Sequence, residues 1–282
     1  MIHMNKVAFG YKKNAQLFSN LDFDIGEPGI YGLLGKNGAG KTTMLKLAAG
    51  LLFPHGGNIS LFGRQAAIRH PEALNKLSFI PEEIAVPGLS LDAYSAIVGG
   101  FYPDFSFQDL KRFAEELEIE RGESMRRMSL GQKKKCLLAV ALASNTEAVI
   151  MDEPTNGLDI PSKQKFRQLL AEQADAHRSF IISTHQVRDV QNIIDPVIIL
   201  DNGEVVFQGD MGTISEGLAM AWYEEKHLPE QALSWQPAVG GVTALVPRDI
   251  APDGSDDIDL ELFFQAVTAN AGLVRSNIEG RS

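Results

Sequence analysis

One stretch of nine residues constrains the fold of this chain more than any other: it runs from Gly35 to Thr43 and reads GKNGAGKTT. Four of these residues match the pattern G-x-x-x-x-G-K-[ST]: Gly35, Gly40, Lys41 and Thr42. The apolar residues 28–34 before it predict a buried strand, and residues 42–49 predict a helix that stops at Gly50. Strand, glycine loop and helix are the context that this motif requires. The sequence therefore predicts an α/β fold with a phosphate-binding loop.

The parts of this loop have distinct expected roles in holding a nucleotide. The glycines allow a tight turn that points successive N–H groups at one anion, and the helix N-terminus adds partial positive charge. Lys41 is expected to reach the β- and γ-phosphates, and the Thr42 hydroxyl to hold Mg²⁺. The predicted nucleotide-binding residues of the loop are Gly35, Lys36, Asn37, Gly38, Ala39, Gly40, Lys41, Thr42 and Thr43. The alternative is a glycine-rich turn with an incidental lysine.

The composition is that of a soluble globular protein. Its 282 residues suffice for one large domain or for a domain with an appendage, and its 44% apolar and 22% charged residues are ordinary for a protein with a core. The formal net charge of −10 does not fit a chain that binds the nucleic-acid backbone, so no nucleic-acid partner is expected. The basic run at 133–135 is predicted to be a solvated helix face.

The cysteine content and the apolar runs indicate in which cellular compartment the chain is expected to work. The single cysteine, Cys136, lies in an apolar run and is predicted to be a small core residue. One cysteine excludes an intrachain disulfide, which fits a reducing compartment. No apolar stretch approaches the about 18 residues of a membrane span, and the N-terminus lacks the apolar region of a signal peptide. Any role at a membrane is therefore expected to depend on another chain.

Alternating and apolar runs predict a mixed sheet. Residues 3–10 and 20–26 are expected to form an antiparallel edge beside the strand that feeds the phosphate loop. Further strands are predicted over residues 58–62, 77–80, 147–151, 179–182, 196–200 and 204–207. The last two strands flank Asn202-Gly203, which is a strong hairpin signal.

Helical spacing predicts an insert between the strands, over about 83–145 of a sheet domain that covers residues 1–210. Its helices are expected over 90–98, 107–117 and 132–143, and two later helices over 162–174 and 187–194. The extension 211–282 is predicted to be a small α+β unit. Its expected elements are helices over 215–226 and 260–269, a hairpin within 232–247 and a charged loop over 253–259.

Two acids follow the apolar strand at 147–151. Asp152 and Glu153 stand at the carboxyl end of that strand, which is where ligands bind in an open parallel sheet. Asp152 is placed to hold Mg²⁺ through water, and Glu153 to polarise the water that attacks a γ-phosphate. Taken alone, one Asp-Glu pair also fits a solvated strand end.

Two further features have both a structural and a functional interpretation. Ser129 and Gln132 form the capping-box pattern S-x-x-Q at the start of a helix, which is a complete structural explanation. The same helix N-terminus, with an accessible Gly131, is also a ready anion site. His185 ends a strand of the sheet that carries Asp152, so it is either a satisfied polar residue or a group that reaches the γ-phosphate.

As a set, these motifs resemble the nucleotide-binding subunits of export-type ABC transporters, over residues 1 to about 210. The matching segments are GKNGAGKTT as Walker A, MSLGQ at 128–132 as the signature motif, VIMDEP at 149–154 as Walker B, TNGLD at 155–159 as the D-loop and STH at 183–185 as the switch-histidine segment. The resemblance implies a P-loop NTPase core with a mixed sheet, an antiparallel β edge and a helical insert. It also implies nucleotide contacts from Ser129, Gly131 and Gln132. It implies catalytic roles for Lys41, Glu153 and His185.

Three positions need comment against this family. Tyr11 falls where the family stacks an aromatic side chain on adenine. Leu130 replaces the first glycine of LSGGQ and puts bulk near the phosphate of the partner's nucleotide. Glu82 stands where the family's Q-loop glutamine is expected, as is frequent in export-type members. Because glutamate only accepts hydrogen bonds and adds charge, Glu82 is expected to bind the metal more directly or to change the sensing step.

The resemblance implies an ATPase subunit that uses ATP and Mg²⁺ to energise transport, export in particular, through a separate integral-membrane permease. Two ATPase subunits, identical or different, would face head to tail, with each ATP between one Walker A loop and the other signature motif. The helical insert and the segment 82–89 would touch the permease. The expected location is cytoplasmic, peripheral on the inner face of the cell membrane.

Two other functions stay open at this point. One is a soluble ABC-type ATPase that works on a protein, ribosome or DNA machine. The single ATPase half and the lack of a long coiled coil or zinc cysteines weigh against it. The other is a regulator that binds ATP and hydrolyses it poorly, an interpretation suggested by Leu130 and Glu82.

Overall fold

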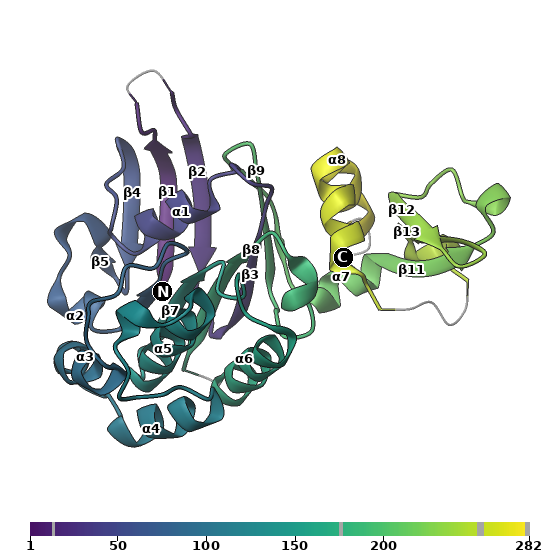
Figure 1. Ribbon diagram of the computed structural model, residues 1–282. Coiled ribbons are helices and arrows are strands. Elements are labelled where there is room, and N and C mark those ends of the chain that lie inside the picture. Colours follow the sequence, from purple (N-terminus) through teal and green to yellow (C-terminus); the bar gives the residue numbers. More distant parts are fainter. Residues whose placement is uncertain (13–14, 175–176, 253–256, 280–282) are drawn as a thin grey trace.

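A computed structural model describes residues 1–12, 15–174, 177–252 and 257–279 (Figure 1). A six-stranded sheet runs through its centre in the order β10-β9-β3-β8-β7-β6, with all strands parallel except β10. Its strands are β3 (Gly29–Leu34), β6 (Leu77–Ile80), β7 (Ala148–Asp152), β8 (Ser179–Thr184), β9 (Val197–Asp201) and β10 (Glu204–Gly209). The expected mixed sheet is confirmed, and so is the hairpin at Asn202-Gly203, where both residues have positive φ.

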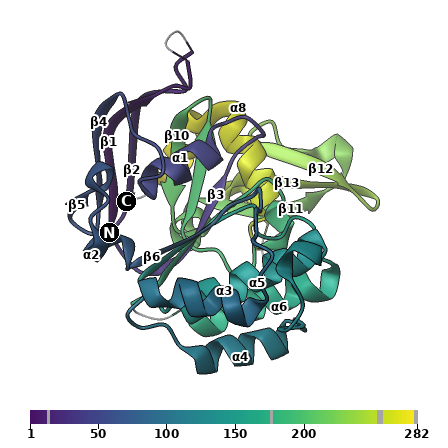
Figure 2. The same cartoon turned by 60° about the vertical axis from the view of Figure 1, so that its left-hand side comes forward.

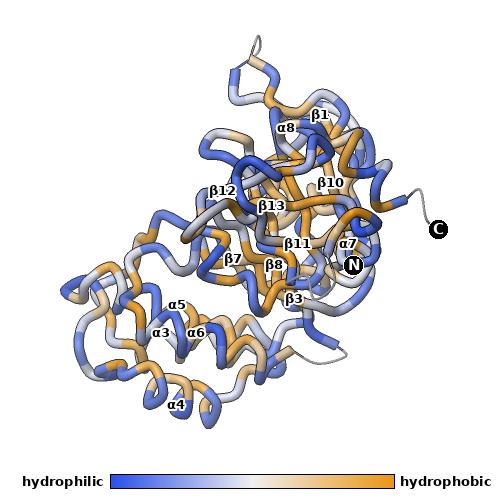
Figure 3. The backbone as a smooth tube through the Cα atoms, turned by 90° about the vertical axis from the view of Figure 1, so that its right-hand side faces the viewer, coloured by the Kyte–Doolittle hydropathy of each residue, from blue (hydrophilic) through white to orange (hydrophobic). Residues whose placement is uncertain are grey.

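The inner strands are apolar along their length because both faces of the sheet are covered. Every residue of β7 and β8 is buried. Figure 3 shows β3, β7 and β8 as a hydrophobic centre, whereas the helices beside them alternate between polar and apolar residues. Parallel strands covered on both faces have this continuous apolar character. Their carboxyl ends meet at one edge, so the polar residues that follow each strand come together there.

The antiparallel strands form a sheet of their own, which corrects the expectation that they lie beside β3. Its order is β2-β1-β4-β5, and its strands are β1 (Ile2–Phe9), β2 (Phe18–Ile25), β4 (Gly56–Leu61) and β5 (Arg64–Gln65). β3 pairs with β8 on one side and with β9 on the other, so it offers no free edge. The apolar face of β2, which includes Leu21 and Phe23, instead packs with α1 (Lys41–Ala48) in one hydrophobic core.

The predicted insert forms a group of helices between β6 and β7 (Figure 1, Figure 2). The insert contains α3 (Leu91–Val98), α4 (Phe107–Glu116) and α5 (Leu130–Ala143), whereas α2 (Pro71–Leu74) precedes β6 and α6 (Ile160–Gln173) follows β7. Ser90 and Ser106 cap α3 and α4, because their hydroxyls accept the backbone N–H groups of Ala93 and Asp109. In the described ranges, no helix combines the length and the apolar character needed to cross a membrane.

Cys136 lies in α5 and is fully buried in the core between the helices and the central sheet, as predicted. Its Sγ lies 3.5 Å from the Sδ of Met128. Burial, with a smaller contribution from Glu123, raises the pKa of the thiol to about 12. The residue therefore behaves as a small apolar core residue.

The chain after β10 forms an α+β extension, coloured green to yellow in Figure 1. Its elements are α7 (Met211–Gly217), β11 (Leu218–Tyr223), β12 (Ser234–Ala238), β13 (Gly241–Pro247) and α8 (Leu260–Glu279). The predicted hairpin is confirmed as β12 and β13, while residues 253–256 of the expected charged loop lie outside the described residues. The Phe263 ring of α8 contacts the Phe207 ring of β10 at 4.9 Å between centroids, so the extension shares the main core.

Two predicted helices are wrong. The segment 215–226 contains β11, which pairs with β13 along all of Leu218–Tyr223, so long-range pairing overrides the local pattern. The segment 187–194 contains one 3₁₀ turn, Val187–Asp189, followed by further turns. Its β-branched residues favour helix weakly, and the irregular path still buries Val190 and Ile194 in the core.

Candidate functional site

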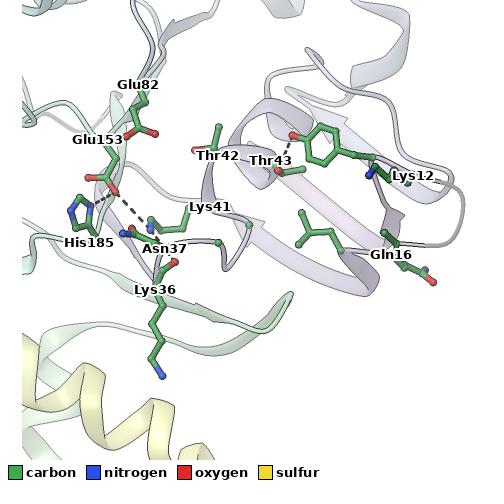
Figure 4. Close-up of a pocket in the computed structure, with 15 residues that line it drawn as sticks. Lys12, Gln16, Lys36, Asn37, Lys41, Thr42, Thr43, Glu82, Glu153 and His185 are labelled. Atoms are coloured by element: carbon green, nitrogen blue, oxygen red, sulfur yellow. Dashed lines mark hydrogen bonds and ion pairs between the residues drawn. The ribbon is translucent and has the colours of Figure 1, made fainter. Parts of the chain in front are cut away.

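A cavity of about 780 Å³ lies at the carboxyl edge of the central sheet (Figure 4). Loops that follow β3, β6, β7 and β8 line it together with the loop between β1 and β2. Eleven residues predicted from the sequence are among its walls: Tyr11, Lys36, Asn37, Gly38, Gly40, Lys41, Thr42, Thr43, Glu82, Glu153 and His185. Residues far apart in the sequence therefore converge on one site.

The phosphate loop has the backbone that binds an anion. Gly38 and Gly40 have φ values of 82° and 108°, which side-chain-bearing residues rarely adopt. A Cβ at Gly40 would also lie 2.8 Å from the Phe18 ring. This position therefore requires glycine both for its positive φ and for lack of space. α1 begins at Lys41 with no side-chain cap on its first turn within the described residues. Its N-terminal N–H groups therefore point toward the cavity as free donors.

Lys41 is buried with only 7% of its surface exposed, and its ammonium lies at the floor of the cavity. Its Nζ donates to the carbonyl of Gly35 at 2.7 Å and lies 3.7 Å from Oε1 of Glu153. Burial lowers the pKa of this lysine, while the carboxylates of Glu153, Asp152 and Glu82 oppose that shift. A phosphate group would give the ammonium a better partner than the loop carbonyl.

The two acids after β7 occupy different positions. Asp152 is buried, and its Oδ1 accepts a hydrogen bond from the Ser183 hydroxyl at the end of β8. Glu153 reaches the cavity, where its Oε1 lies 2.8 Å from Nδ1 of His185. Glu153 also has a φ of 47°, and its backbone N–H donates to the Ser183 carbonyl at 3.0 Å. A strained backbone and two side-chain partners hold this carboxylate in one place.

The oxygen atoms around the loop fit a magnesium ion. Within the described residues, Asp152 Oδ2 and Glu153 Oε2 are buried without a hydrogen-bond partner. The Thr42 hydroxyl and the Glu82 carboxylate belong to the same cavity. The described residues contain no group of three or more His, Cys, Asp or Glu that could hold a metal by themselves. Mg²⁺ in nucleotide sites takes one or two protein oxygens and completes its shell with phosphate and water, so this donor set suits it.

Tyr11 stands at the rim of the cavity with 65% of its surface exposed. Its hydroxyl hydrogen-bonds the Thr43 hydroxyl at 3.0 Å, and its ring meets the edge of Phe9 at 5.1 Å between centroids. These contacts tie the ring to the phosphate loop while one face stays open. An exposed aromatic face beside a phosphate site can stack on a base.

The signature residues lie outside this cavity, at the N-terminus of α5. The Ser129 hydroxyl accepts the backbone N–H of Gln132 at 3.2 Å, so the predicted cap is present. A Cβ at Gly131 would lie 2.7 Å from the carbonyl of Gly157, which explains the glycine by close packing against the 155–159 loop. Leu130 is exposed to 52%. The site residues predicted from the sequence therefore lie on two separate surfaces, the cavity and the N-terminus of α5.

Sequence reasoning missed part of the cavity wall. Lys12, Ala15, Gln16 and Leu17 line it from the loop between β1 and β2. No motif marks these residues, because they reach the site only through the separate antiparallel sheet that packs over α1.

The basic run at 133–135 also differs from the prediction of a solvated face. Lys134 is buried, with 3% of its surface exposed, whereas Lys133 and Lys135 are half-buried. Lys134 therefore faces the sheet rather than solvent, because a period of 3.6 residues points three consecutive side chains in three directions. The sequence offers no signal for this beyond helical phase.

Comparison with known proteins places these features in a family. The sequence profile of a family described as "ABC transporter" matches residues 18–156. The ABC transporter ATP-binding protein YdbJ of Bacillus subtilis, itself uncharacterised, is 30% identical over 245 residues, which cover 78% of this chain and 72% of the relative. The Nod factor export ATP-binding protein I of Cupriavidus metallidurans is 30% identical over 196 residues, 67% of this chain and 65% of the relative.

Solved structures agree on the fold. A dimeric bacterial ABC transporter cassette superposes with a TM-score of 0.66 at 22% identity, covering 74% of this chain and 98% of that chain. The fold class and the ATPase function expected from the motifs are thereby confirmed. The chain belongs to the family of ABC transporter ATP-binding proteins.

Proposed function

We propose that this chain binds ATP with Mg²⁺ in the cavity and hydrolyses it to energise export through a separate integral-membrane permease. The position of Glu153 carries this proposal: its carboxylate lies between Lys41 and His185 in the cavity that contains the phosphate loop. A carboxylate held there is placed to take a proton from water that attacks a γ-phosphate bound at Lys41.

The residues of the cavity have distinct roles in ATP binding and hydrolysis. The loop N–H groups from Gly35 to Gly40 and the N-terminus of α1 bind the phosphates, and Lys41 neutralises the charge that develops on the γ-phosphate. His185 holds the Glu153 carboxylate in place. The Tyr11 ring takes the base. Thr42, Asp152 and Glu82 hold Mg²⁺, which supplies charge neutralisation at the phosphate oxygens.

A second ATPase subunit completes each site in this proposal. Ser129, Gly131 and Gln132 lie outside the chain's own cavity, and Ser129 and Leu130 are exposed, so they are free to meet the nucleotide of a second subunit. The dimeric cassette in the comparison supports this arrangement for the fold. ATP would then join two subunits, and hydrolysis would release them.

The helical insert supplies the surface for the permease in this proposal. Three large apolar side chains within residues 97–107 of the insert are exposed: Ile97 to 59%, Phe101 to 68% and Phe107 to 58%. Exposed apolar side chains gathered within a short segment are typical of interaction sites. We place this chain accordingly on the cytoplasmic face of the membrane. The name of the Cupriavidus relative supports export as the direction.

The domain limits stay part of the proposal. An ATPase domain over 1–210 with an insert over about 83–145 carries all residues named above, and the extension over 211–282 carries none of them. The shared core between α8 and β10 means that the two parts fold together.

Replacing Glu153 tests the proposal. Glu153→Gln keeps the size of the side chain but cannot accept the proton, so we expect ATP binding to persist while turnover falls about 100-fold or more. We also expect an ATP-bound dimer to accumulate, measurable by size-exclusion chromatography with light scattering. The control is Glu147→Gln, at an exposed carboxylate that pairs with Lys76, which should keep normal turnover. Wild-type hydrolysis by Glu153→Gln would refute the role of Glu153.

Transport coupling needs a separate measurement. ATP turnover is compared with and without a co-expressed membrane protein encoded beside this chain's gene. Stimulation by the membrane protein is expected. Equal turnover in both preparations, together with normal ATP binding, would favour a soluble ATPase that serves another machine.

A further inference from the structure

Lys134 is a buried charge that the proposed chemistry leaves without a role. It lies on α5, less than one turn beyond the signature residues Ser129 to Gln132. Its side chain is 3% exposed, and its stem borders a small apolar pocket with Leu138 and Leu158. Burying an ammonium group is costly unless the group has specific partners. Those partners therefore indicate what the residue does.

The partner of Lys134 is the backbone of Glu153. Its Nζ donates a hydrogen bond to the Glu153 carbonyl oxygen. The carboxylates of Glu82, Glu153 and Asp152 lie near enough to oppose the lowering of the lysine pKa by burial. The ammonium thus approaches the acids of the cavity from the side of α5, without lining the cavity itself.

This hydrogen bond acts on a strained residue. Glu153 has a φ of 47°, a conformation that non-glycine residues adopt only when their surroundings hold them there. On one side, the N–H of Glu153 donates to the Ser183 carbonyl at 3.0 Å and to the Ser183 hydroxyl at 3.2 Å. On the other side, Lys134 holds its carbonyl. The direction of the Glu153 carboxylate therefore depends on both neighbours.

We propose that Lys134 is a positioning residue that couples the two nucleotide sites of the dimer. Through it, the helix that presents Ser129 to Gln132 to a second subunit's nucleotide also holds Glu153 of its own site. A small displacement of the α5 N-terminus would move the lysine and, with it, the carboxylate that activates water. The inference rests on the proposed function, because it needs Glu153 as the base and the signature residues as the contact to the second nucleotide.

The test compares Lys134→Met with Lys134→Arg in the full-length protein. Methionine keeps the apolar stem and removes the donor, so we expect kcat for ATP to fall about 10- to 100-fold while the Kd for ATP stays within about twofold. Cooperativity in ATP concentration should fall to a Hill coefficient near one. Arginine should restore most of the turnover and the cooperativity. Lys133→Met, on the neighbouring half-buried lysine, is the control and should behave as the wild type.

Loss of folding is separated from loss of positioning. Thermal unfolding is measured for each variant. If Lys134→Met does not fold, Glu82→Gln is added, since it removes one carboxylate that the lysine balances, and this double variant is compared with Glu82→Gln alone. A double variant that still does not fold would assign Lys134 a purely structural role and overturn the inference.

Other outcomes separate this inference from the proposed function. Normal kcat and cooperativity in Lys134→Met would overturn the inference, as would a loss confined to ATP affinity. If Glu153→Gln abolishes turnover and Lys134→Met does not, only the coupling is wrong. If Glu153→Gln turns over normally, the proposed function itself fails.

Discussion

The N-termini of α1 and α5 differ in what meets the backbone N–H groups that have no partner within the helix. Among the described residues, no side chain caps α1, whose N-cap residue is Gly40, and this end opens into the cavity. The N-cap residue of α5 is Ser129, whose side chain accepts the Gln132 N–H, and Leu130 beside it is exposed. Each helix also carries one buried lysine that contacts Glu153. Lys41 pairs with the carboxylate of Glu153, and Lys134 donates to its backbone carbonyl. A helix N-terminus and a buried lysine therefore form a phosphate site in the chain's own cavity only where both open into it, as Lys41 and the start of α1 do.

The two lysines also share their counter-charges. Burial lowers the pKa of each, and the same three carboxylates, those of Glu82, Asp152 and Glu153, oppose the shift in both cases. Lys12 and Lys36 add two more ammonium groups to the cavity walls. The lysines and the carboxylates at the site therefore nearly balance, which suits phosphates bound together with a divalent cation.

Removing the lysine of α1 should have the largest effect. Lys41→Met deletes a charged donor to the phosphates, so we expect about 100-fold weaker ATP binding. Lys46→Met, on the last turn of the same helix and outside the cavity walls, is the control and should bind ATP normally. Isothermal titration with ATP measures both. Equal ATP affinity in the two variants would contradict the difference between the N-termini of α1 and α5.

Adding a methyl group at the start of α5 should have an intermediate effect. In Gly131→Ala the new Cβ would lie 2.7 Å from the Gly157 carbonyl, so α5 and the 155–159 loop must move apart. We expect a loss of about 2 kcal/mol in the free energy of unfolding, measured with urea. Gly122→Ala is the control, because a Cβ there meets nothing within 4 Å. Unchanged stability in Gly131→Ala would contradict the close packing described here.

Removing the cap of α5 should have the smallest effect on stability and a separate effect on activity. Ser129→Ala loses the hydrogen bond to Gln132, and Ser106→Ala loses the equivalent bond at the start of α4. Each should cost about 1 kcal/mol of unfolding free energy. Only Ser129→Ala should also lower ATP turnover and dimer formation. If both variants lose turnover equally, Ser129 is only a cap.

The parts of the molecule that local patterns encode were predictable from the sequence. The phosphate loop, the strands that feed it and the acids after β7 follow from apolar runs and a motif, so their meeting at one sheet edge could be foreseen. The pairing of β3 with β8 and β9 could not, because apolar strands do not specify their neighbours. β11 was also missed, since its partner β13 lies about twenty residues further along the chain.

Prediction of the site from the sequence is limited in the same way, because contacts between distant segments are not encoded locally. Glu153 and His185 were predicted, but their contact comes from the register of β7 and β8, which pairs Asp152 with Ser183. The burial of Lys134 was missed because three adjacent lysines have the same hydropathy, and only the phase of α5 decides which one faces the acids.

The buried thiol of α5 has a practical consequence. Cys136 is the only cysteine in the sequence, and with a pKa of about 12 only about one thiol in ten thousand is ionised at pH 8. Maleimide dyes attack the thiolate, so the native protein is already close to unreactive toward them. A cysteine introduced at the fully exposed Val239 would carry a fluorophore by itself. Energy transfer between two labelled copies could then follow the opening and closing of the proposed dimer without any change to the core.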